Sequence, residues 1–129
     1  MFAKFFAALN LLCFGIEVSP RVRIGGGLFL PHTVGTVIGA EAIGENCTIM
    51  QGVTLGSRRP DIGFTPSERP LVGNGVTICA GAKIVGRVTI GDNATIGANA
   101  VVLEDVPPNA TVAGVPARVV RMAADGESS

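Results

Sequence analysis

Residues 72–102 read VGNGVTICAGAKIVGRVTIGDNATIGANAVV, and an aliphatic residue recurs at every sixth position of this segment. A second series of small or aliphatic residues follows each member of the first by four positions. The first series is Val72, Ile78, Ile84, Ile90, Ile96 and Val102, and the second is Val76, Ala82, Val88, Ala94, Ala100 and Val106. Helices mix spacings of three and four, and half-buried strands alternate by two. A period of six instead predicts a solenoid, in which each hexad forms one short strand and a turn and stacked coils share a core.

The same period extends toward the N-terminus with one break. Two runs keep the spacing of six: Val18, Ile24 and Leu30, and then Val37, Ile43, Ile49 and Leu55. The step from Leu30 to Val37 is seven, which predicts one inserted residue and a bulge. The only histidine of the chain, His32, lies in this break. Breaks in a regular array favour functional positions.

The chain divides into three parts around this array. Residues 1–15 have apolar residues at helical spacing, which predicts a short amphipathic helix that docks on the solenoid or on a partner subunit rather than a signal peptide. Residues 16–106 form the predicted solenoid of about five coils, interrupted by a polar loop at 57–70. Residues 107–129 form a cap and tail, because Pro107 and Pro108 are expected to end the strand ladder.

Composition excludes several classes of protein. The formal net charge is zero without a long basic run, which argues against nucleic-acid binding. Mean hydropathy is +0.49, yet no apolar run approaches the length of a membrane span. Cys13, Cys47 and Cys79 are odd in number and lack metal-ligand spacing, so they predict small buried thiols in a reducing cytoplasm.

Motifs along most of the chain resemble a known family, the hexapeptide-repeat acyltransferases, and most closely its serine acetyltransferase group. The motifs are FGIEVSP at 14–20, LPHTVG at 30–35, QGVTLG at 51–56, CAGAK at 79–83 and AGVPAR at 113–118. The resemblance implies an all-β fold, a left-handed parallel β-helix, with acetyl-CoA as co-substrate and no metal. It also implies a homotrimer with active sites between subunits. The large helical N-terminal domain of that group is not matched, so a trimer is expected rather than a hexamer.

The resemblance also suggests roles for individual residues. His32 is the expected general base for direct acetyl transfer to a hydroxyl, since a neutral imidazole suits proton removal near neutral pH. Glu17 occupies the acidic position of the family and is expected to orient His32. The expected contacts to acetyl-CoA are the main chain of Ala80 and Ala98, the thioester region at Gly56 and Ser57, and the cations Lys83 and Arg118, with Arg121 as a further candidate.

Three positions depart from the family pattern: Pro31 replaces an Asp, Ser19 replaces a His, and Arg69 replaces a second His. These positions resemble the acceptor site, so the acceptor is left open between a serine-like amino acid and a sugar. Arg58, Arg59 and Arg69 could line the acceptor side.

The sequence is also compatible with other functions. One alternative is a sugar or surface-polysaccharide O-acetyltransferase, and a second is a non-catalytic scaffold, because the repeat specifies fold and not activity. A zinc enzyme of the carbonic anhydrase type requires three His ligands, which one His per chain does not supply within a subunit.

Overall fold

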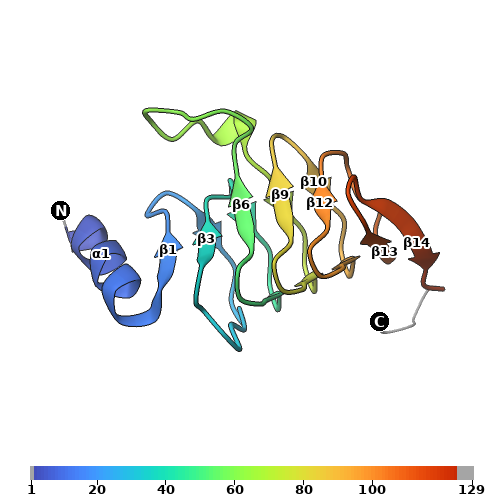
Figure 1. Ribbon diagram of the computed structural model, residues 1–129, viewed down its shortest axis with the longest axis horizontal. Coiled ribbons are helices and arrows are strands. Elements are labelled where there is room, and N and C mark those ends of the chain that lie inside the picture. The colour runs from blue at the N-terminus through green and yellow to red at the C-terminus, as the bar shows by residue number, and fades with distance from the viewer. Residues whose placement is uncertain (1, 125–129) are drawn as a thin grey trace.

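The computed structural model describes residues 2–124 and shows a solenoid of short strands with one helix at its N-terminal end (Figure 1). Helix α1 (Phe2–Phe14) leads into three sheets. Sheet A contains β1 (Ile16–Val18), β3 (Thr36–Ile38), β6 (Thr54–Gly56), β9 (Lys83–Val85) and β12 (Val101–Val102). Sheet B contains β2 (Arg23–Ile24), β4 (Ala42–Ile43), β7 (Leu71–Val72) and β10 (Thr89–Ile90). Sheet C contains β5 (Thr48–Ile49), β8 (Thr77–Ile78), β11 (Thr95–Ile96), β13 (Ala110–Ala113) and β14 (Arg118–Met122).

Each coil passes through the sheets in the order A, B, C before the chain returns to sheet A one strand further along. The pairing is parallel throughout, except that β14 runs antiparallel to β13. In Figure 1 the strands of sheet A climb on the near side while the chain advances to the right, which makes the coil left-handed. The expected fold, an all-β left-handed parallel β-helix of about five coils, is confirmed.

The period of six corresponds to side chains that point into the solenoid. Every member of the two series between Val72 and Val106 is at most 5% exposed. Neighbouring coils place these residues in register, so that Ile78 lies between Ile49 and Ile96, and Ile84 pairs with Leu55. The core is therefore a stack of aliphatic layers, and burial of their apolar surface holds the coils together.

The register around His32 differs from the prediction. Ile38, not Val37, is the inward residue of β3: Ile38 is 1% exposed and pairs with Leu55. Since Phe29 pairs with Thr48, Leu30 aligns with Ile49, and the step from Leu30 to Ile38 is eight residues. The following step, from Ile38 to Ile43, is five residues. The His32 corner thus gains two residues rather than one, a shift the pattern could not reveal because adjacent aliphatic residues satisfy either register.

The solenoid also continues beyond its expected end. Strand β13 pairs in parallel with β11, so Pro107 and Pro108 lie in a connection and do not end the array. Proline is tolerated there because a connection needs no ladder donor at those positions. The last part of the predicted tail, residues 125–129, and Met1 lie outside the described residues.

Helix α1 is not amphipathic, contrary to expectation. Its two polar residues, Lys4 and Asn10, are six positions apart and so roughly 120° apart around the helix axis, with Ala7 and Leu11 between them, which leaves no continuous polar face. None of its side chains is buried, and Cys13 on this helix is exposed rather than buried as expected.

Of the other two cysteines, Cys47 is buried as expected and Cys79 is half-buried. Burial raises the pKa of both these thiols. No helix among residues 2–124 is both long and apolar enough to span a membrane.

Replacing an inward residue of a central coil is expected to destabilise the whole stack. The change Ile84→Ala removes a side chain that is 0% exposed and leaves a cavity, at a cost of about 2–5 kcal/mol in the free energy of unfolding. Urea denaturation measures this value. The matched control is Thr89→Ala, which changes an exposed side chain and should shift the midpoint little. Equal stability of the Ile84→Ala variant and the wild type would contradict the inward register.

Candidate functional site

The predicted site residues gather at the two ends of sheet A. Because its strands are parallel, all except β1, which follows helix α1, begin at the corners that connect sheet C to sheet A. They all end at the corners that connect sheet A to sheet B. We call the first set of corners the His32 edge, comprising residues 30–35, 50–53, 79–82 and 97–100. We include in it the turn 114–117 between β13 and β14, which stacks on the last of these corners. The second set is the loop edge, and it includes residues 57–70.

His32 is an exposed side chain on a well-anchored corner. The hydroxyl of Thr33 donates to the carbonyl of Phe14 at 2.6 Å, and the amide of Gly35 donates to the carbonyl of Gly15 at 2.9 Å. On the other side, the carbonyl of Val34 accepts from the amide of Gly52 at 3.1 Å. Among residues 2–124 no hydrogen bond to the His32 ring is present. The corner therefore fixes the backbone and leaves the imidazole accessible to a substrate.

Four of the expected cofactor residues lie on or beside the same edge. The carbonyl of Ala80 accepts from the amide of Asn99, the residue after Ala98, at 2.9 Å, which stacks these two small corners. The ammonium of Lys83 reaches the carbonyl of Gly52, one coil nearer to His32. Arg118 follows the last corner, where the amide of Ala117 donates to Val101 at 2.9 Å. His32, small residues with accessible backbone and two cations are thus arranged in a row.

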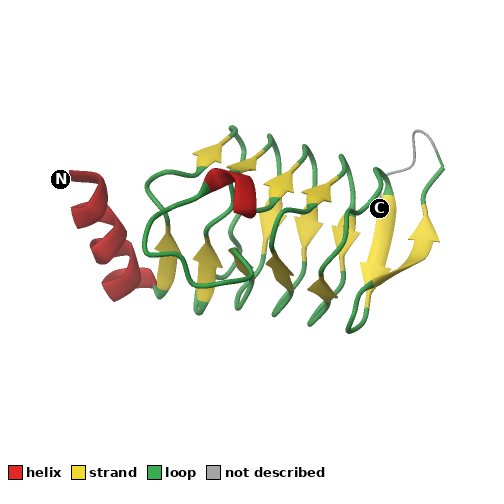
Figure 2. Ribbon diagram, turned by 90° about the horizontal axis from the view of Figure 1, so that it is seen from above, coloured by secondary structure: helices red, strands yellow, loops and turns green. Residues whose placement is uncertain are grey.

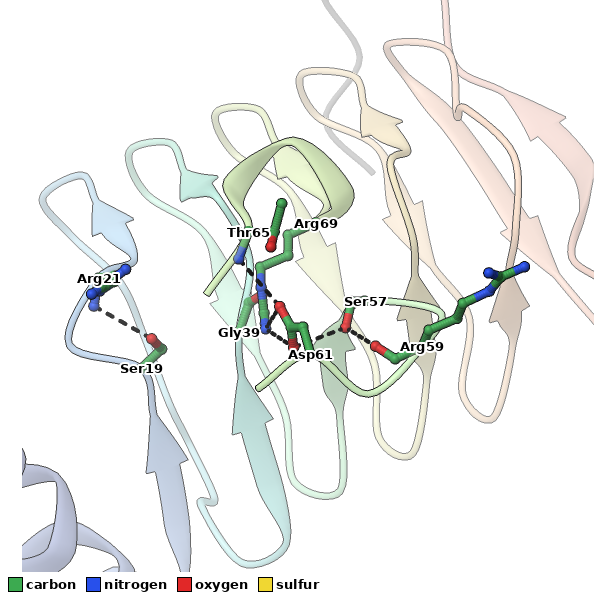
Figure 3. A network of polar contacts seen from close by, with 8 residues as sticks. All are labelled: Ser19, Arg21, Gly39, Ser57, Arg59, Asp61, Thr65 and Arg69. Atoms are coloured by element: carbon green, nitrogen blue, oxygen red, sulfur yellow. Dashed lines mark hydrogen bonds and ion pairs between the residues drawn. The ribbon is translucent and has the colours of Figure 1, made fainter. Parts of the chain in front are cut away.

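Gly56 and Ser57 are not brought to this edge within one chain. They lie at the loop edge, where β6 ends, whereas His32 lies before β3 begins. The Ser57 hydroxyl donates to the carbonyl of Arg59 at 2.6 Å and so serves the fold of the loop (Figure 3).

Glu17 lies between the two edges, as the exposed central residue of β1. It contacts a cavity of about 300 Å³ bounded by α1, sheet A and the 57–70 loop. Two of the three departures from the family pattern, Ser19 and Arg69, line the same cavity, and Pro31 does not. No hydrogen bond joins Glu17 to His32 within the described part of the chain. The cavity therefore brings Glu17 together with Ser19 and Arg69. Arg58 and Arg59, which were also expected at the acceptor side, line a different cavity.

The 57–70 loop is folded back over the N-terminal coils and carries the short 3-10 helix η1 (Pro66–Glu68), as Figure 2 shows. Arg69 holds it, with a side chain only 11% exposed. Its Nη2 donates to both carboxylate oxygens of Asp61 at 2.7 and 2.8 Å, and its Nη1 donates to the carbonyl of Gly39 at 2.8 Å. The guanidinium also lies 4.2 Å from the centre of the Phe64 ring. We call this group, Asp61, Phe64 and Arg69, the loop clasp, and Figure 3 shows Asp61 and Arg69 in contact.

The clasp changes the electrostatics of the cavity. The hydrogen bond from Arg69 holds the pKa of Asp61 below its usual value. The positive charge of Arg69 is consequently neutralised by the carboxylate of Asp61 in the same chain. Asp61 and Phe64 were missed by sequence reasoning, and the only available signal was that the loop contains both an acid and several arginines. Within residues 2–124 no three His, Cys, Asp or Glu side chains converge as a metal site would require.

Comparisons with known proteins agree with this architecture. Residues 69–104 match the family model described as bacterial transferase hexapeptide (six repeats). A serine acetyltransferase of Synechococcus elongatus is 46% identical over 113 residues, which cover 87% of this chain and 45% of that protein. The chain spans about half the length of the curated relatives that it matches.

Solved structures give the same result. The serine acetyltransferase of Neisseria gonorrhoeae aligns with a TM-score of 0.86 and 41% identity, covering 96% of this chain and 47% of that one. The serine acetyltransferase of Brucella abortus in complex with coenzyme A aligns with a TM-score of 0.85 and 39% identity, covering 95% of this chain and 48% of that one.

Disrupting the clasp is expected to loosen the loop. In Asp61→Asn the guanidinium of Arg69 loses its charged partner, so tryptic cleavage after Arg58 at neutral pH should be faster than in the wild type. The control Glu104→Gln removes an exposed carboxylate elsewhere and should leave the cleavage rate unchanged. Equal cleavage of the wild type and Asp61→Asn would mean that the clasp does not hold the loop.

The clasp should also respond to acid in a defined direction. Because the pKa of Asp61 is lowered in the folded chain, its contribution is present above the ordinary carboxyl pKa of about 4 and is lost as pH falls through the lowered value. Amide hydrogen exchange of residues 57–70, corrected for its intrinsic pH dependence, should therefore show protection that persists through pH 4 and disappears below it. Loss of protection well above that pH would contradict the assignment.

Proposed function

Because the chain belongs to the hexapeptide-repeat transferases and is homologous to about half of each serine acetyltransferase that it matches, we propose that it is an acetyl-CoA-dependent O-acetyltransferase. The observation that carries the proposal is the His32 edge. The exposed imidazole of His32 lies on a corner that hydrogen bonds hold in place. The corners that carry Ala80 and Ala98 lie along the same edge of the solenoid. This arrangement suits a base next to an extended cofactor arm.

His32 is the general base in this proposal. Its imidazole takes the proton from the acceptor hydroxyl as the hydroxyl oxygen attacks the thioester carbonyl. The C–S bond then breaks and the leaving thiolate takes the proton from His32, so the products are an O-acetyl ester and the free thiol of CoA, and the imidazole is neutral again. Transfer is direct, so no residue of the chain becomes acetylated. Glu17, on the neighbouring strand β1, orients the second ring nitrogen once substrate binding brings the two side chains together.

Acetyl-CoA is proposed to lie along the His32 edge. Ala80 and Ala98 let its pantetheine arm approach the backbone, and Lys83 and Arg118 attract its phosphates. Gly56 and Ser57 act near the thioester, although in one chain they lie at the other end of sheet A. A neighbouring copy would supply them, which supports a homotrimer with sites between subunits.

The acceptor is proposed to be a small hydroxyl compound, either a serine-like amino acid or a sugar. The loop clasp favours the second candidate, a sugar O-acetyltransferase. Arg69 is the only cation that lines the Glu17 cavity, and Asp61 already neutralises it. An amino-acid carboxylate would therefore find no free cation among the described lining residues, whereas a neutral sugar needs none.

The proposal assigns catalysis to the solenoid, which begins at residue 16 and continues through β13, together with its 57–70 loop. A cytoplasmic location is part of the proposal, because the three cysteines are free thiols. A non-catalytic scaffold is the remaining alternative, and the following experiment separates it from an enzyme.

Loss of the base should abolish most of the activity. With acetyl-CoA and a panel of serine, homoserine and neutral or amino sugars, release of free CoA should fall by about 10²–10⁴-fold in His32→Ala, because proton removal is no longer assisted. The control Val34→Ala changes an exposed side chain, 74% accessible, on the same corner. Equal CoA release by wild type and His32→Ala would overturn the catalytic assignment, and turnover with serine alone would overturn the preference for sugars.

Glu17 should behave as a positioning residue. In Glu17→Gln the turnover number should fall while KM for acetyl-CoA stays unchanged, because the side chain acts on His32 and not on the cofactor. Glu17→Asp, which restores a carboxylate, should recover part of the turnover. A change in KM alone, or no recovery in Glu17→Asp, would contradict this role.

A further inference from the structure

A second cavity lies at the loop edge, between the 57–70 loop and the connection from β9 to β10. Its volume is about 390 Å³, and it is lined by Arg58, Arg59, Ser67, Glu68, Gly86 and Arg87. It shares no lining residue with the Glu17 cavity. Three guanidinium groups therefore surround one space to which the proposed acetyl transfer assigns no role.

Two of these guanidinium groups are held in place by the chain. Arg58 donates from Nη2 to the carbonyl of Leu103 at 2.8 Å. Its side chain passes directly over Gly86, where a Cβ atom would lie only 2.7 Å from Nε, and the positive φ of 87° at this position also favours glycine. Arg87 is ion-paired with Glu41 and also donates to the carbonyl of Arg69 at 3.4 Å. The cavity is thus organised before any ligand arrives.

The third group is free to bind. The Arg59 side chain extends away from the loop clasp, as Figure 3 shows, and among the described residues only its carbonyl oxygen has a partner, the Ser57 hydroxyl. The lining carboxylate is that of Glu68. Because Glu41 compensates Arg87, the charges of Arg58 and Arg59 together exceed the single negative charge of Glu68.

We propose that this cavity is a binding site for a phosphoryl group, such as a phosphate or diphosphate ester. Guanidinium forks match the oxygen geometry of phosphate and form charge-assisted hydrogen bonds with it. The positive charges of Arg58 and Arg59 outnumber the negative charge of Glu68, so a phosphoryl group meets a net electrostatic attraction in the cavity. The site goes beyond the proposed acetyl transfer, since its residues are separate from His32, Glu17 and the His32 edge.

Calorimetric titration of the full chain with inorganic pyrophosphate, at constant ionic strength, tests the proposal. The wild type should bind saturably, Arg59→Gln should bind about tenfold more weakly through loss of a charge-assisted contact, and Arg58→Gln/Arg59→Gln more weakly still. The control Arg21→Gln removes an exposed arginine outside the cavity and should bind as the wild type does. Circular dichroism confirms that each variant is folded.

Arg59→Gln makes the test decisive, because it breaks no side-chain contact of the folded chain. The proposal is overturned if Arg59→Gln retains full affinity, if Arg21→Gln weakens binding equally, or if the wild type shows no saturable binding. Titration with CoA and pantetheine identifies the source of the phosphoryl group. A loss in Arg59→Gln for CoA but not for pantetheine assigns the site to the phosphates of the cofactor, and a loss for pyrophosphate alone assigns it to a phosphorylated acceptor.

Discussion

Stacking of aliphatic side chains from coil to coil is the interaction on which the rest of the molecule depends. Most of the central strands, from β4 to β12, contribute one inward residue, and that residue packs on its counterparts in the coils before and after it. The interior is too narrow to accommodate an extra residue, so any insertion must be expelled at a corner. The enlarged His32 corner and the 57–70 loop are two such insertions, and both project from a scaffold that they do not disturb. The fold therefore separates its stabilising residues from those available for chemistry.

This separation explains what could be predicted from the sequence. The series through Ile84 is regular because each member meets the same environment, and so its burial was predictable. At β3 the pattern failed, since Val37 and Ile38 are both aliphatic and only the pairing of Ile38 with Leu55 decides between them. The loop clasp could not be predicted from the sequence for a different reason. The contact between Arg69 and Gly39 joins residues 30 positions apart through a loop that carries no periodic pattern.

The clasp also shows how the residues around one arginine fix its position. An arginine at position 69 is long enough to reach both Asp61 and the carbonyl of Gly39, and Gly39 leaves the necessary space, because a Cβ there would lie 2.6 Å from the arginine Nη1. A cation held in this way is a structural group and not a ligand for an anionic substrate. The loop gains order, and the cavity beside Glu17 loses the positive charge that a carboxylate would need.

The 57–70 loop also places different charges in the two cavities that it borders. Its first arginines, Arg58 and Arg59, stand on the side of Gly86, whereas Arg69 at its end is turned toward Asp61 and sheet A. Because the clasp fixes the path of the chain between them, Arg58 and Arg59 remain in one cavity and Arg69 remains in the other. One side of the loop therefore presents a neutralised cation and the Glu17 carboxylate, and the other presents two cations with only Glu68 between them. A neutral hydroxyl compound and a phosphoryl group are the ligands that these two environments separately favour.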